Sequence, residues 1–175
     1  MNKLSQKSGL LSRIDGRLLK LFYGNPVTKY TVREIAKLIK ISKSTAQNQL
    51  MILREIGVIS KDNEWVDNWI NRYYKSSYYV EMIINSGLID YLDQELVASS
   101  IILFGSFRKG ESIKSSDIDI FVECTKEKSL DLKKYERMLG HKIEIFMKPK
   151  ITMLPKGLLN NVVNGIKLKG YFTIK

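Results

Sequence analysis

The chain has 175 residues, of which 44% are hydrophobic and 27% are charged, so it can bury a core and is not globally disordered. It lacks the run of about 18 uncharged apolar residues that indicates a membrane span, and residues 1–15 lack the long apolar segment of a secretory signal. The single cysteine, Cys124, allows no internal disulfide and suits a reducing compartment. We therefore expect a cytoplasmic protein that does not enter the membrane.

The formal net charge of +11 favours a polyanionic partner such as nucleic acid or a nucleotide. Most of this excess lies near the N-terminus, where residues 1–60 carry eleven basic side chains against three acidic ones, a local net charge of +8. This part of the chain is therefore the first candidate for contact with nucleic acid.

Residues 10–67 are predicted to form three helices and a short hairpin. The first helix should end at Gly24-Asn25-Pro26, and Thr31 with Glu34 has the spacing of a capping box at the start of the second. Ser42 is the expected N-cap of the third helix, and strands at 58–60 and 64–66 should form the hairpin. The apolar residues at helical spacing are Leu11, Ile14, Leu18, Leu21 and Phe22, then Ile35, Leu38 and Ile39, then Ala46, Leu50, Leu53 and Ile56.

Within this region, TVREIAKLIKISKSTAQNQLMILREIGVISK resembles the helix-turn-helix core of many prokaryotic regulators, and the hairpin extends the resemblance to a winged helix. Residues 43–56 would then be the recognition helix. Gln and Asn side chains can bond adenine edges, whereas Ser, Thr and Lys contact phosphates. The residues expected to bind DNA are Lys43, Ser44, Thr45, Gln47 and Asn48 on this helix and Lys61 on the wing. The alternative is a winged helix that contacts protein.

Residues 68–97 have a helical pattern that is broken near Ser86-Gly87. The segment is dense in tyrosine, with Tyr73, Tyr74, Tyr78 and Tyr79. We interpret it as a connector helix that packs against the neighbouring domains. The alternative is that the tyrosines form a base-stacking surface or a homodimer interface.

The hydrophobic period changes in residues 98–175, which we expect to form a small α/β domain. The predicted strands are 100–104, 117–122 and 142–146; the predicted helices are 130–139 and 158–163, with an extended segment at 166–171. The predicted fold class is thus α+β, with a winged-helix domain at 10–67, a helical connector at 68–97 and this sheet domain at 98–175.

Two aspartates mark the second predicted strand. Because side chains alternate along a strand, Asp117 and Asp119 share one face, while Ile118 and the next alternate residues enter the core. Two carboxylates so close repel each other, and a divalent cation removes that conflict. Glu144 has the same placement on the third predicted strand and would complete a three-carboxylate cluster for phosphoryl transfer if the strands pair.

A second motif follows the first predicted strand directly. Gly105 lets backbone N–H groups approach a polyphosphate, and the hydroxyl of Ser106 adds a donor. Gly110 permits another tight turn, and Arg108 and Lys109 supply positive charge for phosphate. Each feature alone is weak, but their combination with the later carboxylates is specific.

Together these residues resemble a known signature. LFGSFRKGESIKSSDIDIFVE is similar to the signature of the polymerase-β-type nucleotidyltransferase superfamily, and more closely to that of the minimal nucleotidyltransferases of bacteria and archaea. The resemblance covers about residues 98–172. It matches Gly105 and Ser106 to the nucleotide-phosphate motif, Lys109 and Gly110 to a basic-Gly pair, Ser116, Asp117 and Asp119 to the metal motif, and Glu144 to the third acidic position. Two residues depart from the pattern. Arg108 stands where minimal proteins often carry Ala, and Glu144 stands where many polymerases carry Asp.

The resemblance implies an enzyme that uses Mg²⁺ or Mn²⁺ and passes a nucleoside monophosphate from an NTP to a hydroxyl of protein or nucleic acid. Related minimal proteins are often antitoxins that modify a toxin, which suggests a toxin-like partner protein as acceptor. The alternative is a DNA-binding regulator or antitoxin whose domain binds nucleotide or a partner without efficient turnover. His141 is expected to be an exposed turn residue and Cys124 to be structural.

Overall fold

The computed structural model describes residues 7, 9–126 and 128–174. The chain folds into two compact units, Met1–Asn71 and Arg72–Lys175, hereafter unit 1 and unit 2. Unit 1 is helical and unit 2 contains a four-stranded sheet, so the α+β class expected from the sequence is confirmed. Among the described residues, no helix has both the length and the apolar character needed to cross a membrane.

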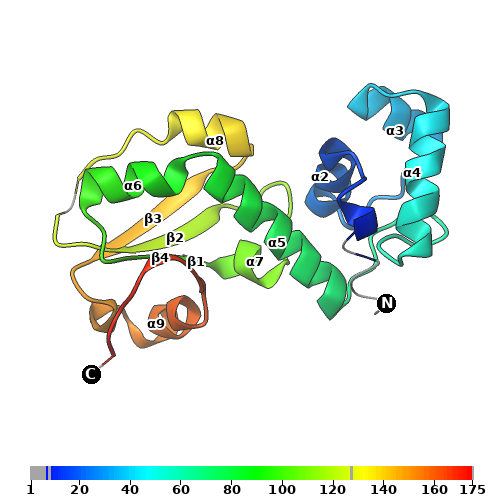
Figure 1. Ribbon diagram of the computed structural model, residues 1–175. Coiled ribbons are helices and arrows are strands. Elements are labelled where there is room, and N and C mark those ends of the chain that lie inside the picture. The colour runs from blue at the N-terminus through cyan, green and yellow to red at the C-terminus, as the bar shows by residue number, and fades with distance from the viewer. Residues whose placement is uncertain (1–6, 8, 127, 175) are drawn as a thin grey trace. The chain divides into compact units, whose positions relative to one another are not determined.

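The helices of unit 1 begin at the capping residues that the sequence predicts. The Oγ1 atom of Thr31 accepts from the backbone N–H of Glu34 at 3.3 Å, and Glu34 accepts from the backbone of Thr31 at 2.8 Å, which completes the capping box. Ser42 caps the following helix by accepting from the backbone N–H of Thr45 at 3.0 Å. The helices are α2 (Gly16–Gly24), α3 (Val32–Ile39) and α4 (Lys43–Glu55) (Figure 1).

Three details of unit 1 differ from the sequence prediction. The first predicted helix does not run through residues 11–22. The side chain of Asp15 accepts from the backbone N–H of Arg17 and caps α2, which begins at Gly16. Leu11 and Ile14 are therefore buried but lie before that helix. Leu38 is 57% exposed, because α3 buries only the stripe of Ile35, Ala36 and Ile39. The wing has a single antiparallel bridge, Ile59 with Trp65, in place of two strands.

Asn71 holds the end of the hairpin in unit 1. Its buried amide nitrogen donates to the carbonyl oxygens of Gly57 at 2.9 Å and Val66 at 2.7 Å, on either side of the hairpin. Its amide oxygen accepts from the ammonium of Lys7 at 2.7 Å. One side chain therefore satisfies two backbone carbonyls that would otherwise lose their hydrogen bonds away from water.

Unit 2 is built on strands β1 (Ser100–Phe104), β2 (Ile118–Glu123), β3 (Ile143–Lys148) and β4 (Ile166–Gly170), in the order β3-β2-β1-β4. β1 is antiparallel to both β2 and β4, whereas β2 and β3 are parallel. The three predicted strands and the extended C-terminal segment are therefore confirmed, with β2 beginning at Ile118, one residue later than expected. The helices are α5 (Trp69–Asn85), whose residues from Arg72 onward belong to unit 2, α6 (Leu88–Leu96), α7 (Gly105–Lys109), α8 (Lys133–Leu139) and α9 (Lys156–Val163), with a 3₁₀ turn η1 (Ile151–Met153).

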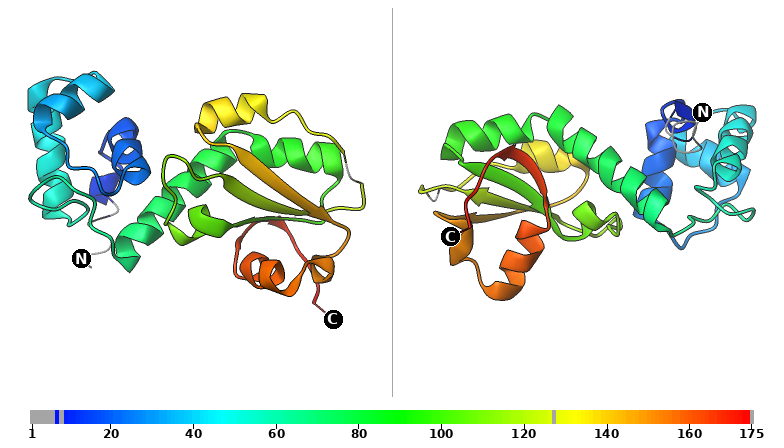
Figure 2. Two further views of the ribbon diagram at one scale, coloured as in Figure 1. Left: turned by 180° about the vertical axis from the view of Figure 1, so that it is seen from behind. Right: turned by 60° about the horizontal axis from the view of Figure 1, so that its bottom comes forward.

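The two faces of this sheet are covered by different helices. α6 and α8 lie on one face, and α9 with η1 lies on the other (Figures 1 and 2). Phe104 and Phe121 pack with Ile151, Leu154 and Val162 on the α9 face. By strand alternation, Asp119 points to this same face as Phe121. The predicted break of the connector is also confirmed, because α5 ends at Asn85 and Gly87, at φ +78°, precedes α6.

Replacing Asn71 by Ala should lower the free energy of unfolding of unit 1 by about 1–3 kcal/mol, because the carbonyl oxygens of Gly57 and Val66 lose their donor. Both tryptophans, Trp65 and Trp69, lie in unit 1, so urea unfolding followed by tryptophan fluorescence reports on it. The exposed Asn85→Ala is the matched control and should leave the transition in place. An unchanged midpoint for Asn71→Ala would contradict the anchoring role.

Candidate active site

Three carboxylates gather where the parallel strands β2 and β3 begin. Asp119 and Glu144 are register partners across these strands, so their side chains project from the same face of the sheet. Asp117 lies one residue before β2 and is exposed, as is Glu144, whereas Asp119 is partly buried. The condition on which the role of Glu144 depended is therefore met, because the second and third strands pair and bring the Asp119 and Glu144 backbones together.

The environment of Asp119 disfavours its ionised form. Burial first, and then the negative charges of Glu144 and Asp117, together raise the pKa of this carboxyl to about 6. A carboxylate that is both desolvated and surrounded by like charge is a place where a cation or a proton is stabilising. In the described part of the chain, no basic side chain lowers the pKa of Asp119. The negative charge of these carboxylates is therefore not balanced by a nearby cation.

The backbone of Gly105 lies directly against the Asp119 carboxylate. Gly105 has a φ of +68°, in the left-handed region, and a methyl group at this position would overlap the Asp119 side-chain oxygen. Gly105 connects the end of β1 to α7, and its neighbour Ser106 is partly buried in the first turn of that helix. The absent side chain therefore brings the Gly-Ser motif and the carboxylates together at the same edge of the sheet.

The segment from α7 to Asp117 is held by polar side chains of α5. Ser76 donates to the carbonyl oxygen of Arg108 at 2.9 Å, and the buried ammonium of Lys75 donates to the carbonyl oxygen of Ser112. Gly110, at φ +70°, packs against the backbone carbonyl of Arg72 so closely that a methyl group would overlap it. These contacts fix the first part of the loop that runs from α7 to Asp117.

Lys75 was not identified by the sequence analysis. It recurs at helical spacing with Tyr79 and Ile83, both buried, so a lysine in the apolar stripe of α5 was the available signal. A buried lysine needs hydrogen-bond acceptors, and the carbonyl that this one contacts belongs to the loop before the aspartates.

His141 is buried, and the expectation of an exposed turn residue is wrong. Its ring packs edge-on against Phe107 at 4.8 Å and Tyr79 at 5.7 Å between ring centroids. Its Nδ1 atom lies 2.9 Å from the carbonyl oxygen of Ser116, with which it hydrogen-bonds in the tautomer that carries hydrogen on Nδ1. The alternating pattern of a short strand cannot predict whether the residue before that strand is covered by a helix from another part of the chain. Cys124 is buried directly after β2, as a structural cysteine would be.

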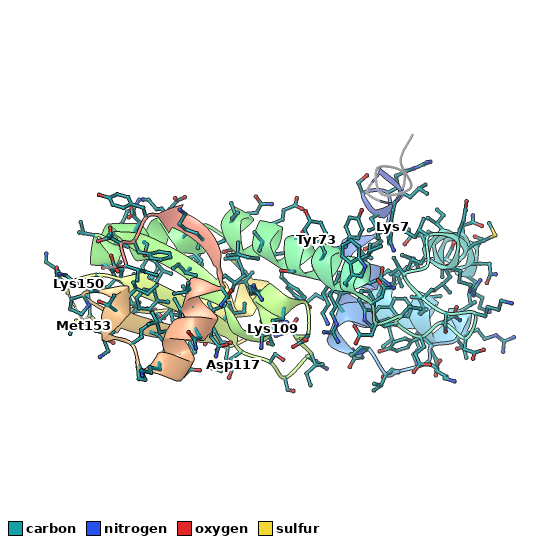
Figure 3. The ribbon with its side chains drawn as sticks, turned by 90° about the horizontal axis from the view of Figure 1, so that it is seen from below. Lys7, Tyr73, Lys109, Asp117, Lys150 and Met153 are labelled. Carbon is teal, nitrogen blue, oxygen red and sulfur yellow. The ribbon has the colours of Figure 1, made fainter. Side chains whose placement is uncertain are left out.

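The phosphate-binding residues suggested by the sequence lie on α7 and the loop after it. Arg108 is partly buried, Lys109 is exposed and Gly110 is buried. The hydroxyl of Ser116 accepts from the backbone N–H of Ile113 at 2.9 Å and so forms part of a turn. Figure 3 shows Lys109 and Asp117 away from the end of the sheet at which Lys150 and Met153 lie.

The donor set suits a hard divalent cation. Carboxylate oxygens are the ligands that Mg²⁺ and Mn²⁺ prefer, and the pKa of Asp119 is raised by burial and then by the like charges of Glu144 and Asp117. In the described residues, no group of three His, Cys, Asp or Glu side chains forms a complete metal site. A cation at this edge of the sheet would therefore be held by at most two of these carboxylates and would need further oxygen ligands.

In unit 1, the side chains expected to contact DNA all face solvent. Ser44 and Thr45 each lie 2.8 Å, between hydroxyl oxygens, from Ser42 at the start of α4. The buried residues Ala46, Leu50 and Leu53 form the opposite side of this helix. The exposed set comprises Lys43, Ser44, Thr45, Gln47 and Asn48 on α4 and Lys61 on the wing.

Comparison with known families agrees with both parts of this description. Residues 86–162 match the family described as nucleotidyltransferase domain, and residues 18–61 match the family described as bacterial regulatory protein, arsR family. The chain joins an ArsR-type helix-turn-helix domain to a nucleotidyltransferase domain. No curated protein and no solved structure gave a significant match.

The nucleotidyltransferase match begins at the residue after α5, extends through most of α9 and includes the Gly-Ser motif and all three carboxylates. The helix-turn-helix match runs from α2 through α4 to Lys61 on the wing. The family resemblance inferred from the sequence is therefore confirmed for each half of the chain.

Gly105→Ala should disrupt the nucleotidyltransferase domain, because the new methyl group meets the Asp119 carboxylate and the backbone is in a conformation that alanine disfavours. We expect the free energy of unfolding to fall by about 2 kcal/mol or more, as measured by thermal unfolding followed by circular dichroism. Gly157→Ala in α9 is the control, since nothing lies within 4 Å of the added methyl group, and it should be neutral or stabilising. Equal effects of the two substitutions would contradict the proposed packing.

Asp119→Asn should stabilise the metal-free nucleotidyltransferase domain near neutral pH. The folded-state pKa of about 6 exceeds the ordinary aspartate value of 3.8, so ionisation destabilises the fold increasingly from about pH 4 upward and fully above pH 6. The free energy of unfolding of the variant should exceed that of wild type by on the order of 1 kcal/mol, because solvent screens the charge of a partly exposed group. Unfolding of wild type and variant across this pH range should converge near pH 4. A constant difference would show that the charge of Asp119 is not the cause.

Proposed function

We propose that the nucleotidyltransferase domain transfers a nucleoside monophosphate from an NTP to an acceptor hydroxyl and that the helix-turn-helix domain binds DNA. The observation that carries the catalytic part is the packing of Asp119 between Gly105 of the Gly-Ser motif and its strand partner Glu144. This arrangement brings candidate hydrogen-bond donors for the substrate phosphates and the carboxylates to one edge of the sheet. Both groups are needed for phosphoryl transfer by positioning and charge stabilisation.

Asp117 and Asp119 would hold the divalent cation, with Glu144 as a third carboxylate beside them. Mg²⁺ or Mn²⁺ bound there would neutralise charge on the donor phosphates and on the pyrophosphate that leaves. The partial burial of Asp119 strengthens its interaction with a cation relative to a carboxylate in bulk water.

The remaining residues would position the donor and accept a proton. Ser106, with the backbone around Gly105, would donate hydrogen bonds to the phosphates, and Arg108 and Lys109 would supply positive charge. In the reaction the acceptor oxygen bonds to the α-phosphorus, and the bond from that phosphorus to pyrophosphate breaks. Glu144 is exposed and suitably placed to take the proton of the acceptor hydroxyl.

The helix-turn-helix domain would place α4 in the major groove. Its N-terminal residues carry amide and hydroxyl side chains that face solvent, and the domain lies in the part of the chain with the largest excess of positive charge. Binding would rest on phosphate contacts from Lys43 and Lys61, with Gln47 and Asn48 toward base edges.

A second function has specific support in two positions. Arg108 stands where minimal nucleotidyltransferases often carry alanine, and Glu144 where many polymerases carry aspartate. With these changes the domain would serve as a nucleotide-sensing or partner-binding part of a DNA-binding regulator or antitoxin without efficient turnover. The acceptor would then be replaced by a toxin-like partner protein or a second copy of the chain.

The catalytic proposal predicts Mg²⁺- or Mn²⁺-dependent transfer of label from an α-labelled NTP to an acceptor. Asp117→Ala with Asp119→Ala should reduce transfer by at least about a hundredfold, because the cation loses both aspartates. Asp90→Asn, an exposed change on α6, should leave it unaltered. If wild type binds no nucleotide in the presence of metal, the catalytic proposal fails.

The DNA-binding proposal predicts binding whose logarithmic affinity falls linearly and steeply with the logarithm of salt concentration. Lys43→Ala should reduce that slope by about 1, as expected for one lost phosphate contact. Gln47→Ala should weaken specific sites more than non-specific DNA. Gel-shift titrations against the DNA upstream of the coding sequence measure both effects, with Lys134→Ala in unit 2 as the charge-matched control. Salt-independent binding would overturn the proposal.

A further inference from the structure

An open pocket of about 630 Å³ lies beside α8 in unit 2, and we call it the α8 pocket. Its walls come from the loop before β2, from α8 and from the turn before β3. Its volume is in the range of pockets that bind small molecules. Four cationic side chains line it: Lys114, Lys133, Arg137 and Lys142.

The α8 pocket lies apart from the carboxylates of the candidate active site. α8 covers the face of the sheet opposite to α9, whereas Asp119 points to the α9 face and Glu144 projects on the same side as Asp119 (Figures 1 and 2). Neither of these two carboxylates lines the pocket, and no residue of α7 does. Of the three carboxylates, Asp117 alone belongs to the lining. A ligand in the pocket would therefore lie beside the transfer site and not within it.

Hydrogen bonds join the walls of the α8 pocket. The backbone N–H of Ile118 donates to the carbonyl oxygen of Lys142 at 2.8 Å, and His141 contacts the carbonyl oxygen of Ser116 at 2.9 Å. Glu136 accepts from the backbone N–H of Ile143 at 3.2 Å, which ties α8 to β3. The three walls are therefore held together before any ligand arrives.

Three of the four cations are available to a ligand. Lys142 is engaged by Glu136, with 3.3 Å between the ammonium and the carboxylate. Lys114, Lys133 and Arg137 are exposed and make no ion pair with any residue that the structure describes. The Nε atom of Arg137 donates to the carbonyl oxygen of Lys133 at 3.2 Å, which orients the guanidinium on α8. Two ammonium groups and one oriented guanidinium thus line the pocket without a carboxylate partner.

The net charge of the lining selects the kind of anion. Asp117 and Glu136 stand against the four cations, so the lining has a net charge of +2 with His141 neutral. A phosphomonoester carries about −1.5 to −2 at neutral pH, and its three terminal oxygens accept from guanidinium and ammonium groups. A phosphodiester carries about one negative charge and would leave part of the lining unneutralised. A triphosphate carries more negative charge than this lining balances. The lining therefore fits a phosphomonoester better than either alternative.

The remainder of the ligand is expected to be hydroxylated. Among the residues that the structure describes, no aliphatic or aromatic hydrocarbon side chain lines the pocket. Its other polar groups include the hydroxyls of Ser115 and Ser116. The Ser116 hydroxyl accepts from the backbone N–H of Ile113 at 2.9 Å and can still donate its own hydrogen. Such walls bind hydroxyl groups and offer no surface for an apolar ring or chain.

We propose that the α8 pocket binds a small hydroxylated phosphomonoester, such as a phosphorylated sugar, that is neither the donor nor the acceptor of the proposed transfer. Lys133 and Arg137 lie one helical turn apart on α8 and hold the phosphate, and Lys114 reaches it from the loop before β2. The ligand joins α8 to the loop that carries Asp117, which couples the two sites. The inference goes beyond the proposed function, because it requires no turnover.

Residue-resolved NMR of the full chain tests binding, with ribose 5-phosphate as the probe and ribose as its phosphate-free control. We expect amide shifts at residues 114–117 and 137–142 with ribose 5-phosphate alone. Lys133→Ala with Arg137→Ala should weaken this binding at least about tenfold, because two charged contacts to phosphate are lost. Lys114→Ala, on the opposite wall, should weaken it separately. Lys134→Ala, an exposed lysine on α8 outside the pocket, should bind as wild type.

Three results of the titration would overturn the proposal. The first is a lack of shifts at these amides, or equal affinity of wild type and the double variant. The second is inorganic phosphate binding as tightly as ribose 5-phosphate, which would show that the pocket does not recognise the hydroxylated group. The third is AMP binding at the same amides at least about tenfold more tightly than ribose 5-phosphate, which would assign the pocket to a mononucleotide.

Competition with NTP separates this proposal from the proposed function. NTP added with Mg²⁺ should shift amides of α7 and leave the ribose 5-phosphate shifts at residues 137–142 in place. Displacement of ribose 5-phosphate by NTP would assign the pocket to the donor and overturn the proposal. Absent NTP binding with intact ribose 5-phosphate binding would instead refute the catalytic function and leave the phosphomonoester site standing.

Discussion

The close packing of the Asp119 carboxylate against the backbone of Gly105 is the constraint on which the site depends. It requires a residue without a side chain at positive φ after β1, and it brings the start of α7 to the start of β2. The parallel pairing of β2 with β3 then places Glu144 beside Asp119, and burial with like charge raises the Asp119 pKa. The Gly-Ser motif and the carboxylates form one site because of this contact.

Buried polar groups from elsewhere in unit 2 keep that site in shape. Lys75 and Ser76 on α5 bond to backbone carbonyls of α7 and of the loop after it, and His141 contacts the carbonyl oxygen of Ser116. Their function is to satisfy main-chain groups of a loop that has no secondary structure of its own. The same loop forms one wall of the α8 pocket, so the proposed metal ligand Asp117 and the pocket are set by a shared scaffold.

Charge is distributed differently in the two units. Unit 1 carries exposed cations and amides on α4, as expected for contact with DNA phosphates and bases, whereas unit 2 separates its carboxylates at β2 and β3 from the cations around α8. A separation of this kind allows a metal cation to be held at one point and an anionic ligand at another.

The sequence by itself determined the elements and the motif. An apolar run predicted β1 and period-two alternation predicted β2 and β3, because these patterns reflect burial on two faces or on one. Thr31 and Ser42 predicted the helix starts, and the spacing from Gly105 to Asp119 indicated the family. Only the tertiary structure decided that His141 and Lys75 are buried, that Leu38 is exposed and that four cations from the loop before β2, from α8 and from the turn before β3 share one pocket. Each of these depends on which distant segment covers a residue, and no local period contains that information.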